Sequence, residues 1–165
     1  MSQTRFINPP ALRRPPGYTH VVEVTAPARI VYLAGQLGVD GYDKVVGDFR
    51  RQAVQTFENL KTALAAVGAQ FQHVVKFNNY LVDRAYLPTF REVRDSYLAK
   101  NDRPASTTIA ISGLAREGAL IEIEAVAVLP AAARAKTARS ASKSAAKAAG
   151  KTRSARSARR RARPR

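Results

Sequence analysis

Residues 119–128 alternate between two kinds of position, which predicts a β-strand. The side chains of a strand point to opposite faces with a period of two. One face of this strand is then wholly apolar, and the other carries Glu122 and Glu124 between apolar residues. A carboxylate in so apolar a strand belongs either to the rim of a sheet or to a functional site. The β-prone residues 107–111 predict another strand just before it.

Three more strands are predicted nearer the N-terminus. Residues 18–24 and 29–36 are rich in β-branched and aromatic side chains, and only a short turn separates them. This pair is therefore predicted to form an antiparallel hairpin. Residues 73–82 predict a third strand. The polar, proline-rich residues 1–16 are interpreted as an extended arm that leads into the first strand.

Two helices are predicted from apolar residues that recur at steps of three and four. The clearer one covers residues 48–67, with Asp48 as its N-terminal cap and Gly68 just past its end. The other covers residues 83–100. The apolar stripes are Val54, Phe57, Leu60, Leu64 and Val67 in the first helix and Phe90, Val93 and Tyr97 in the second, while Gln52 is placed on the polar side.

The predicted order of elements, ββαβαββ, indicates an α/β fold of the α+β kind, with a mixed sheet and both helices on one face. Hairpins are expected at both ends of the chain. The other face of the sheet would be open and largely apolar, which monomers seldom tolerate. That face is therefore predicted to be buried between identical subunits.

The positive charge of the chain, +16 in total, is concentrated at its C-terminal end. Of the 28 lysines and arginines, 13 lie in residues 131–165, which contain no acidic residue. The other 15 stand against all 12 acidic residues, so residues 1–130 carry only +3. We expect one domain over 1–130 and a disordered basic tail over 131–165. The tail either contacts nucleic-acid phosphates without sequence preference or only keeps the protein in solution.

The absence of cysteine excludes disulfides, thiolate catalysis and cysteine-ligated metals. His20 and His73 are interpreted as surface or hydrogen-bonded residues, so neither a metal nor another cofactor is expected. No stretch has the pattern of a signal peptide, and no apolar run is long enough to span a bilayer. The expected location is the cytoplasm.

Six short motifs are spaced along the predicted domain: Gly17-Tyr18, Tyr32-Leu33-Ala34-Gly35-Gln36, Asn59-Leu60-Lys61, Val74-Val75-Lys76, Arg103-Pro104-Ala105, and Ile-Glu-Ile-Glu-Ala-Val-Ala-Val at 121–128. In their order and spacing they resemble the RidA (YjgF) family over residues 18–128. The resemblance implies a chorismate-mutase-like fold and a homotrimer with a ligand cleft at each of three subunit interfaces. It also implies hydrolysis of reactive enamines and imines, such as 2-aminoacrylate, to ketoacids and ammonia. Some members of the family carry an endoribonuclease label.

One position departs from the pattern of the family's deaminases. In those proteins the Pro-Ala pair precedes an arginine that clamps the substrate carboxylate, but here Pro104-Ala105 precedes Ser106. A serine cannot hold a carboxylate as a guanidinium does, because charged hydrogen bonds are about twice as strong as neutral ones. Deamination of 2-iminoacids is therefore expected to be weak or absent. Ser106 either donates to a different ligand in the cleft or only begins a strand.

The resemblance assigns the remaining site residues. It implies that Glu122 positions the attacking water, while the residues alone also allow a rim carboxylate paired with a lysine or arginine. Tyr18, Gly35 and Asn79 are candidate ligand-binding neighbours in the cleft that could equally serve the fold. Arg94 stands where the family often has an asparagine. We hypothesise that it replaces the missing cation; the alternative is a solvated helix arginine.

Three functions remain open at this stage. The first is a RidA-like hydrolase of enamines, imines or related C–N compounds. The second is a trimer that binds a metabolite without catalysis, since the carboxylate clamp is absent. The third is a nucleic-acid-associated protein that acts through its basic tail. Whether the protein is an enzyme is left open by the sequence.

Overall fold

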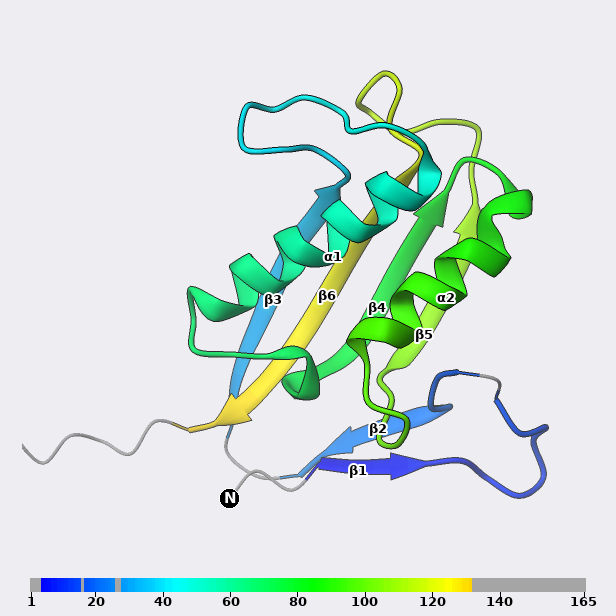
Figure 1. The fold of residues 1–165 in the computed structure, drawn as a ribbon. Coiled ribbons are helices and arrows are strands. Elements are labelled where there is room, and N and C mark those ends of the chain that lie inside the picture. The colour runs from blue at the N-terminus through cyan, green and yellow to red at the C-terminus, as the bar shows by residue number, and fades with distance from the viewer. Residues whose placement is uncertain (1–3, 16, 26–27, 132–165) are drawn as a thin grey trace, which may run out of the picture. The chain divides into compact units, whose positions relative to one another are not determined.

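The computed structural model describes residues 4–15, 17–25 and 28–131 (Figure 1). Apart from Ala131, the predicted basic tail lies outside the described residues. The strands are β1 (Thr4–Ile7), β2 (Val21–Val24), β3 (Ala28–Leu37), β4 (Val74–Leu81), β5 (Ala105–Ala110) and β6 (Ile121–Pro130). The helices are α1 (Phe49–Ala65) and α2 (Leu87–Tyr97), with the short 3-10 helices η1 (Phe71–His73) and η2 (Arg84–Tyr86).

Four strands form the main sheet in the order β3-β6-β4-β5. β6 pairs antiparallel with both β3 and β4, whereas β4 pairs parallel with β5. α1 and α2 cover the same face of this sheet (Figure 1). The predicted mixed sheet with two helices on one face is therefore confirmed.

The predicted hairpin of residues 18–24 and 29–36 is wrong. β2 instead pairs antiparallel with β1 in a separate two-stranded sheet, where Arg5 and Glu23 form an ion pair of 2.7 Å. The arm predicted over residues 1–16 thus contains a short strand before its prolines. β3 takes β6 as its partner because both are ten residues long, and a long partner satisfies more backbone groups than the four-residue β2 could.

The hairpin expected at the C-terminal end is also wrong, because β4 lies between β5 and β6. The chain crosses from β4 through α2 and returns parallel to β4, which makes β5 an edge strand. Residues 111–120 then carry the chain past β4 to the centre of the sheet. A pattern of two adjacent β-prone runs does not reveal that a third strand will lie between them.

Helix α1 begins and ends close to the predicted positions. The Asp48 side chain accepts a hydrogen bond of 3.0 Å from the backbone N–H of Arg51, one of the donors that a helix start leaves without a partner. Beyond the helix, Gly68 has a φ of 72°, the left-handed conformation that favours glycine. Both end signals were therefore predicted correctly.

The buried face of α1 is rotated from the predicted stripe. Val54, predicted to be buried, is 41% exposed, and Gln52, predicted to be on the polar side, is 1% exposed. The Gln52 amide ties the helix to the connection before β6: Nε2 donates to the Gly118 carbonyl at 3.1 Å, and Oε1 accepts from the Leu120 N–H at 2.8 Å. These backbone partners lie far along the chain, so the hydrophobic pattern could not indicate that the amide would be buried.

The core lies between the two helices and the sheet face that they cover. β6 contributes alternate residues, including Ile121 and Ile123, which have no exposed surface. At its centre the Phe57 ring stacks on Tyr97 with 4.9 Å between ring centroids. The other residues predicted on the helical stripes that are buried here are Leu60, Leu64, Phe90 and Val93.

The opposite face of the sheet presents apolar side chains to solvent. Ile30 and Tyr32 of β3 are 55% and 79% exposed, and Ile109 of β5 is 46% exposed. Glu122 and Glu124 share this face, as the alternation of their strand predicted. We call this side of the sheet the open face. An apolar surface of this kind on a small domain is typical of a protein–protein contact.

Replacing Gln52 by leucine tests the tether between α1 and the connection before β6. The Gln52→Leu variant removes both hydrogen-bonding partners of backbone groups beside the core, so we expect it to lower the free energy of unfolding by about 1–3 kcal/mol. Urea denaturation at a fixed protein concentration measures the change. Val54→Ala on the exposed side of the same helix is the control and should change stability by about 0.5 kcal/mol or less. Equal losses in the two variants would contradict the tether.

Candidate functional site

The residues predicted for the site lie on opposite faces of the main sheet. In β6, Glu122 pairs with Tyr80 of β4 and lies on the open face. In β5, Ser106 pairs with Phe77, which is buried against the helices. Cross-strand partners share a face. Within one chain the sheet therefore separates Glu122 from Ser106.

Glu122 lies over an irregularity in β3. The pairing of β3 with β6 shifts between Leu33 and Gln36, and Gly35 lies within this bulge. A Cβ atom on Gly35 would come within 1.8 Å of Glu122 Oε1. The absence of a side chain at Gly35 leaves the space that the carboxylate occupies. Glu122 is half-buried, and its side chain makes no hydrogen bond or ion pair with any described residue.

Glu124, two residues further along the same face, does have partners. It accepts hydrogen bonds from the Asn78 amide at 3.2 Å and from the Tyr80 hydroxyl at 3.3 Å. Burial, followed by the negative charge of Glu124, raises the pKa of the Tyr80 hydroxyl, which therefore remains a donor. The side chain of Glu124 is thus held within the fold, whereas that of Glu122 is not.

Tyr18, Arg94 and Ser106 line one pocket of about 430 Å³, which we call the arginine pocket. Tyr18 comes from the segment before β2, Arg94 from α2, and Ser106 from the edge strand β5. The structure thus brings together three of the predicted ligand-binding residues from three separate parts of the chain. The volume falls within the range of small-molecule sites.

Arg94 is 6% exposed, so it is not the solvated helix arginine of the alternative interpretation. Its Nε donates to Asp95 Oδ1 at 2.8 Å, and Arg103 binds the same oxygen at 2.5 Å. Burial acts to raise the pKa of Asp95, but the hydrogen bonds from Arg103 and Arg94 outweigh it and hold that pKa below its ordinary value. The charged carboxylate therefore holds Arg94 in place.

Gly17 allows the chain to pass over the guanidinium of Arg94. A Cβ atom at Gly17 would lie 2.3 Å from Nη2 of Arg94 and 3.3 Å from Nη1 of Arg103. The segment is fixed next to this point by the N–H of Thr19, which donates to the Pro104 carbonyl at 3.2 Å. This glycine is what lets Tyr18 reach the arginine pocket from the N-terminal segment.

Asn79 supports the pocket from below and does not line it. Its side chain is buried, 2% exposed, and its Nδ2 lies within hydrogen-bonding distance of Ser106 Oγ at 3.0 Å and Thr108 Oγ1 at 3.1 Å. It also donates to the Thr107 carbonyl at 2.8 Å. Asn79 therefore orients the hydroxyl groups of Ser106 and Thr108, and it is connected to the pocket only through these two groups.

Sequence reasoning missed three further residues of the arginine pocket, Arg13, Arg84 and Arg91. A signal for two of them was present, since Arg84, Arg91 and Arg94 follow one another at steps of seven and three. Such steps place side chains on one face of a helix. Arg13 had no such signal, because only the fold of the N-terminal segment brings it near α2.

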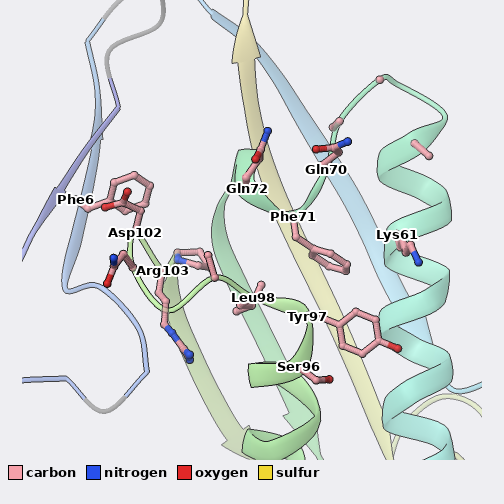
Figure 2. Close-up of a pocket in the computed structure, with 16 residues that line it drawn as sticks. Phe6, Lys61, Gln70, Phe71, Gln72, Ser96, Tyr97, Leu98, Asp102 and Arg103 are labelled. Carbon is pink, nitrogen blue, oxygen red and sulfur yellow. The ribbon is translucent and has the colours of Figure 1, made fainter.

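A larger pocket of about 1100 Å³ lies at the other ends of α1 and α2, and none of the predicted site residues lines it (Figure 2). Its wall includes Phe71 and Tyr97, whose rings also pack in the aromatic cluster of the core. The Tyr97 hydroxyl donates to Glu58 at 2.9 Å; burial and this carboxylate raise the pKa of Tyr97 to about 12. The Tyr97 hydroxyl thus already makes a hydrogen bond within the fold.

Both histidines have structural partners, as predicted. His20 Nε2 lies 2.9 Å from the Arg13 carbonyl oxygen, and His73 Nδ1 accepts from the Gln70 N–H at 2.9 Å. Across the described residues, no group of three or more metal-ligating side chains is found. No helix in the same part of the chain is long and apolar enough to cross a membrane.

Residues 11–129 match the protein family described as Endoribonuclease L-PSP. This match covers Glu122, the arginine pocket and most of the described residues. The chain belongs to this family, which is the RidA (YjgF) family that its motifs resemble.

Individual relatives agree with this assignment. The chain is 37% identical to protein DfrA of Myxococcus xanthus over 113 residues, 67% of this chain and 84% of that protein. It is 32% identical to the 2-iminobutanoate/2-iminopropanoate deaminase of Dermatophagoides farinae over 132 residues, 78% of this chain and 99% of that protein.

Solved structures show the same fold. The Rid family protein YyfB from Yersinia pestis superimposes with a TM-score of 0.71 at 32% identity, covering 76% of this chain and 98% of that chain. RidA from an Antarctic Psychrobacter bacterium gives a TM-score of 0.59 at 33% identity, with coverage of 68% and 88%. The chorismate-mutase-like fold expected from the motifs is therefore confirmed.

Substituting Gly35 tests the close approach of Glu122. A Gly35→Ala change should push the Glu122 carboxylate away from β3, because the new methyl group and Oε1 cannot share the same space. Stability should change by only about 0.5 kcal/mol, since the displaced group ends a flexible side chain without partners. A crystal structure of the variant and its thermal melting provide the two measurements. Gly41→Ala, which would meet no atom within 4 Å, is the control. An unmoved carboxylate in Gly35→Ala would refute the constraint.

Proposed function

We propose that this protein is a cytoplasmic homotrimer with small-molecule clefts between its subunits, and that it hydrolyses enamines, imines or related C–N compounds. The observation that carries the proposal is Glu122, a half-buried carboxylate on an apolar face, held over Gly35 and without a partner among the described residues. Partial burial of an unpaired charge is costly, so a functional reason for it is favoured. A relative named 2-iminobutanoate/2-iminopropanoate deaminase supports this class of reaction.

Assembly of identical chains would unite the two halves of the site. Glu122 lies on the open face and Arg94 in the arginine pocket, so one chain cannot present both to one ligand. If the open face of one copy packs beside the β5 edge of the next, the exposed Ile30 and Tyr32 become buried. The carboxylate of one copy then approaches the arginines of its neighbour, an electrostatically complementary contact.

In such a cleft Glu122 would act as general base and then as general acid. It accepts a proton from water as the water oxygen bonds to the imine carbon, while the C=N electrons move to nitrogen. The protonated carboxyl group returns this proton to nitrogen, which gives a neutral carbinolamine. Glu122 then takes the hydroxyl proton and passes it to the amine as the C–N bond breaks, so that a carbonyl product and ammonia are released. Arg94 would hold an anionic group of the substrate, since a guanidinium presents several N–H donors in a fixed geometry.

Ser106 supports a second function, ligand binding without catalysis. The family's deaminases have a clamping arginine at this position, and a serine hydroxyl supplies only a neutral hydrogen bond. A 2-iminoacid held less firmly would lose the alignment that speeds the reaction. Ammonia release from a purified sample therefore separates a hydrolase from a binding protein.

Replacing Glu122 by glutamine tests the proposed reaction. Glu122→Gln keeps the size of the side chain but removes the proton acceptor, so the rate of ammonia release from imines generated in solution should fall by about 100-fold or more. A coupled assay of ammonia measures the rate. No release by the unaltered protein would favour the binding function, and unchanged release by the variant would refute the role of Glu122.

Glu124→Gln is the matched control for this experiment. It makes the same chemical change on the same strand and face, at a carboxylate that Asn78 and Tyr80 already hold. Its rate should stay within a few-fold of the unaltered protein. Ultracentrifugation of all three proteins should give the mass of a trimer; a single-chain particle would remove the interfacial cleft.

The basic residues of the C-terminal region favour an additional association with nucleic acid. Residues 131–165 contain 13 lysines and arginines, no acidic residue and no aromatic side chain. Phosphate contacts by such residues release counterions, whereas base stacking is not available to them. Three copies in one trimer would add avidity. The binding we propose is therefore electrostatic and independent of base sequence.

Removing residues 131–165 tests this association. The full chain should bind two unrelated DNA duplexes equally, and its affinity should fall by roughly 10³-fold or more between about 50 and 200 mM salt. The shortened chain should bind at least about tenfold more weakly at the lower salt concentration. Fluorescence anisotropy measures each affinity. Equal binding by both proteins would show that the basic region does not contact DNA.

A further inference from the structure

Four arginines gather around the arginine pocket: Arg13, Arg84, Arg91 and Arg94. Arg84 comes from η2, and Arg91 and Arg94 come from α2, where a step of three places them on one helical face. Among its lining residues there is no aspartate or glutamate in the part of the chain that the structure describes. The pocket thus has a strong positive charge that no acidic side chain in its wall offsets.

Little of this charge is neutralised from outside the wall. Asp95 binds Arg94 but shares its carboxylate with Arg103, so it offsets at most one charge of the pocket. The side chains of the other three arginines make no hydrogen bond or ion pair with any described residue. Like charges this close repel one another. The arrangement is therefore suited to an anion that is not part of the chain.

Acidic residues next to these arginines in the sequence have other partners. The Asp83 side chain accepts a hydrogen bond from the Ala85 N–H at 2.8 Å, where it caps η2. Glu92 pairs with Arg50 of α1 at 2.5 Å. The chain thus contains carboxylates that could have neutralised the pocket, and the fold directs them elsewhere.

We infer that the arginine pocket takes a small ligand with two anionic groups, a carboxylate together with either a second carboxylate or a phosphate monoester. We call both kinds of ligand dianions after their two anionic groups, although the phosphate group itself carries up to two charges. This inference rests on the proposed function, because it treats the pocket as one half of the interfacial cleft. Glu122 of a neighbouring copy would offset one further charge. Of the four arginines, at least two remain uncompensated after Asp95 and Glu122 are counted. A monocarboxylate would leave one of them unsatisfied.

The neutral groups of the pocket fit the same ligand class. The hydroxyls of Ser106 and Thr108 stand on β5 opposite the helix, where Asn79 orients them. Each hydroxyl can donate one hydrogen bond to an anionic oxygen. A volume of about 430 Å³ holds a compact ligand of this type. The neutral hydroxyls thus lie on the β5 side of the pocket, and the guanidinium groups of Arg84, Arg91 and Arg94 lie on its helical side.

Calorimetric titration of the full chain with three probes tests this inference. The probes are pyruvate with one carboxylate, 2-oxoglutarate with two, and 2-phosphoglycolate with a carboxylate and a phosphate. At least one dianion should bind about tenfold or more tightly than pyruvate, because each further charged hydrogen bond adds roughly that factor. Preference for one of the two dianions identifies the second group as carboxylate or phosphate. Equal affinity for all three probes would overturn the inference.

Charge-removing variants locate the effect in the pocket. Arg84→Gln and Arg91→Gln change exposed residues that the core does not need, and each should reduce the preference for a dianion over pyruvate by about tenfold. Arg51→Gln removes the same charge from an exposed arginine of α1 outside the pocket, so it should leave that preference unchanged. An unchanged preference in both pocket variants would overturn the inference.

The same titration separates this inference from the proposed reaction. Glu122→Gln should still prefer the dianion over pyruvate even where ammonia release is lost. If the protein binds dianions but releases no ammonia from any imine, the inferred ligand class stands and the hydrolase function is refuted. If the protein releases ammonia but binds pyruvate and the dianions equally, the proposed reaction stands and the inferred ligand class is refuted.

Discussion

The pairing of β6 with two neighbours is the constraint on which the rest of this structure depends. Its backbone bonds to β3 on one side and β4 on the other, so its odd residues must face the helices and its even residues the open face. A shift of one residue would bury two glutamates in the core and expose its isoleucines. The register that protects the core is therefore also what places Glu122 at the open face.

Glu122 and Arg94 are held in different ways. The carboxylate of Glu122 fills the space beside Gly35, where any other residue would have a Cβ atom. Arg94 is positioned by a charge, since Asp95 holds it below the segment at Gly17. The first arrangement leaves a carboxylate without a side-chain partner among the described residues, and the second fixes a cation firmly. The proposed function needs this division, with Glu122 to react and Arg94 to anchor the ligand.

Local signals were sufficient for much of the fold. Asp48 and Gly68 mark the ends of α1 through hydrogen bonds and backbone conformation that depend on nearby residues only. The alternation of β6 was likewise predicted from the sequence, because the side chains of a strand alternate between its two faces. Strand partners were not: residues 18–24 found their partner in the arm, and β4 came between the last two strands. Partner choice depends on which long-range pairing satisfies most backbone groups, and no local pattern encodes this.

By itself, the sequence determined the two α-helices and the longer strands, the family, the glutamates on one strand face, and the serine in place of the clamping arginine. These follow from residue periodicity and from motifs that are continuous in the chain. Only the tertiary structure decided that Arg94 is buried on Asp95, that Arg13 joins it from the N-terminal segment, and that the sheet separates Glu122 from both. The reason is physical: burial and charge compensation are set by neighbours in space, and here those neighbours come from distant parts of the chain.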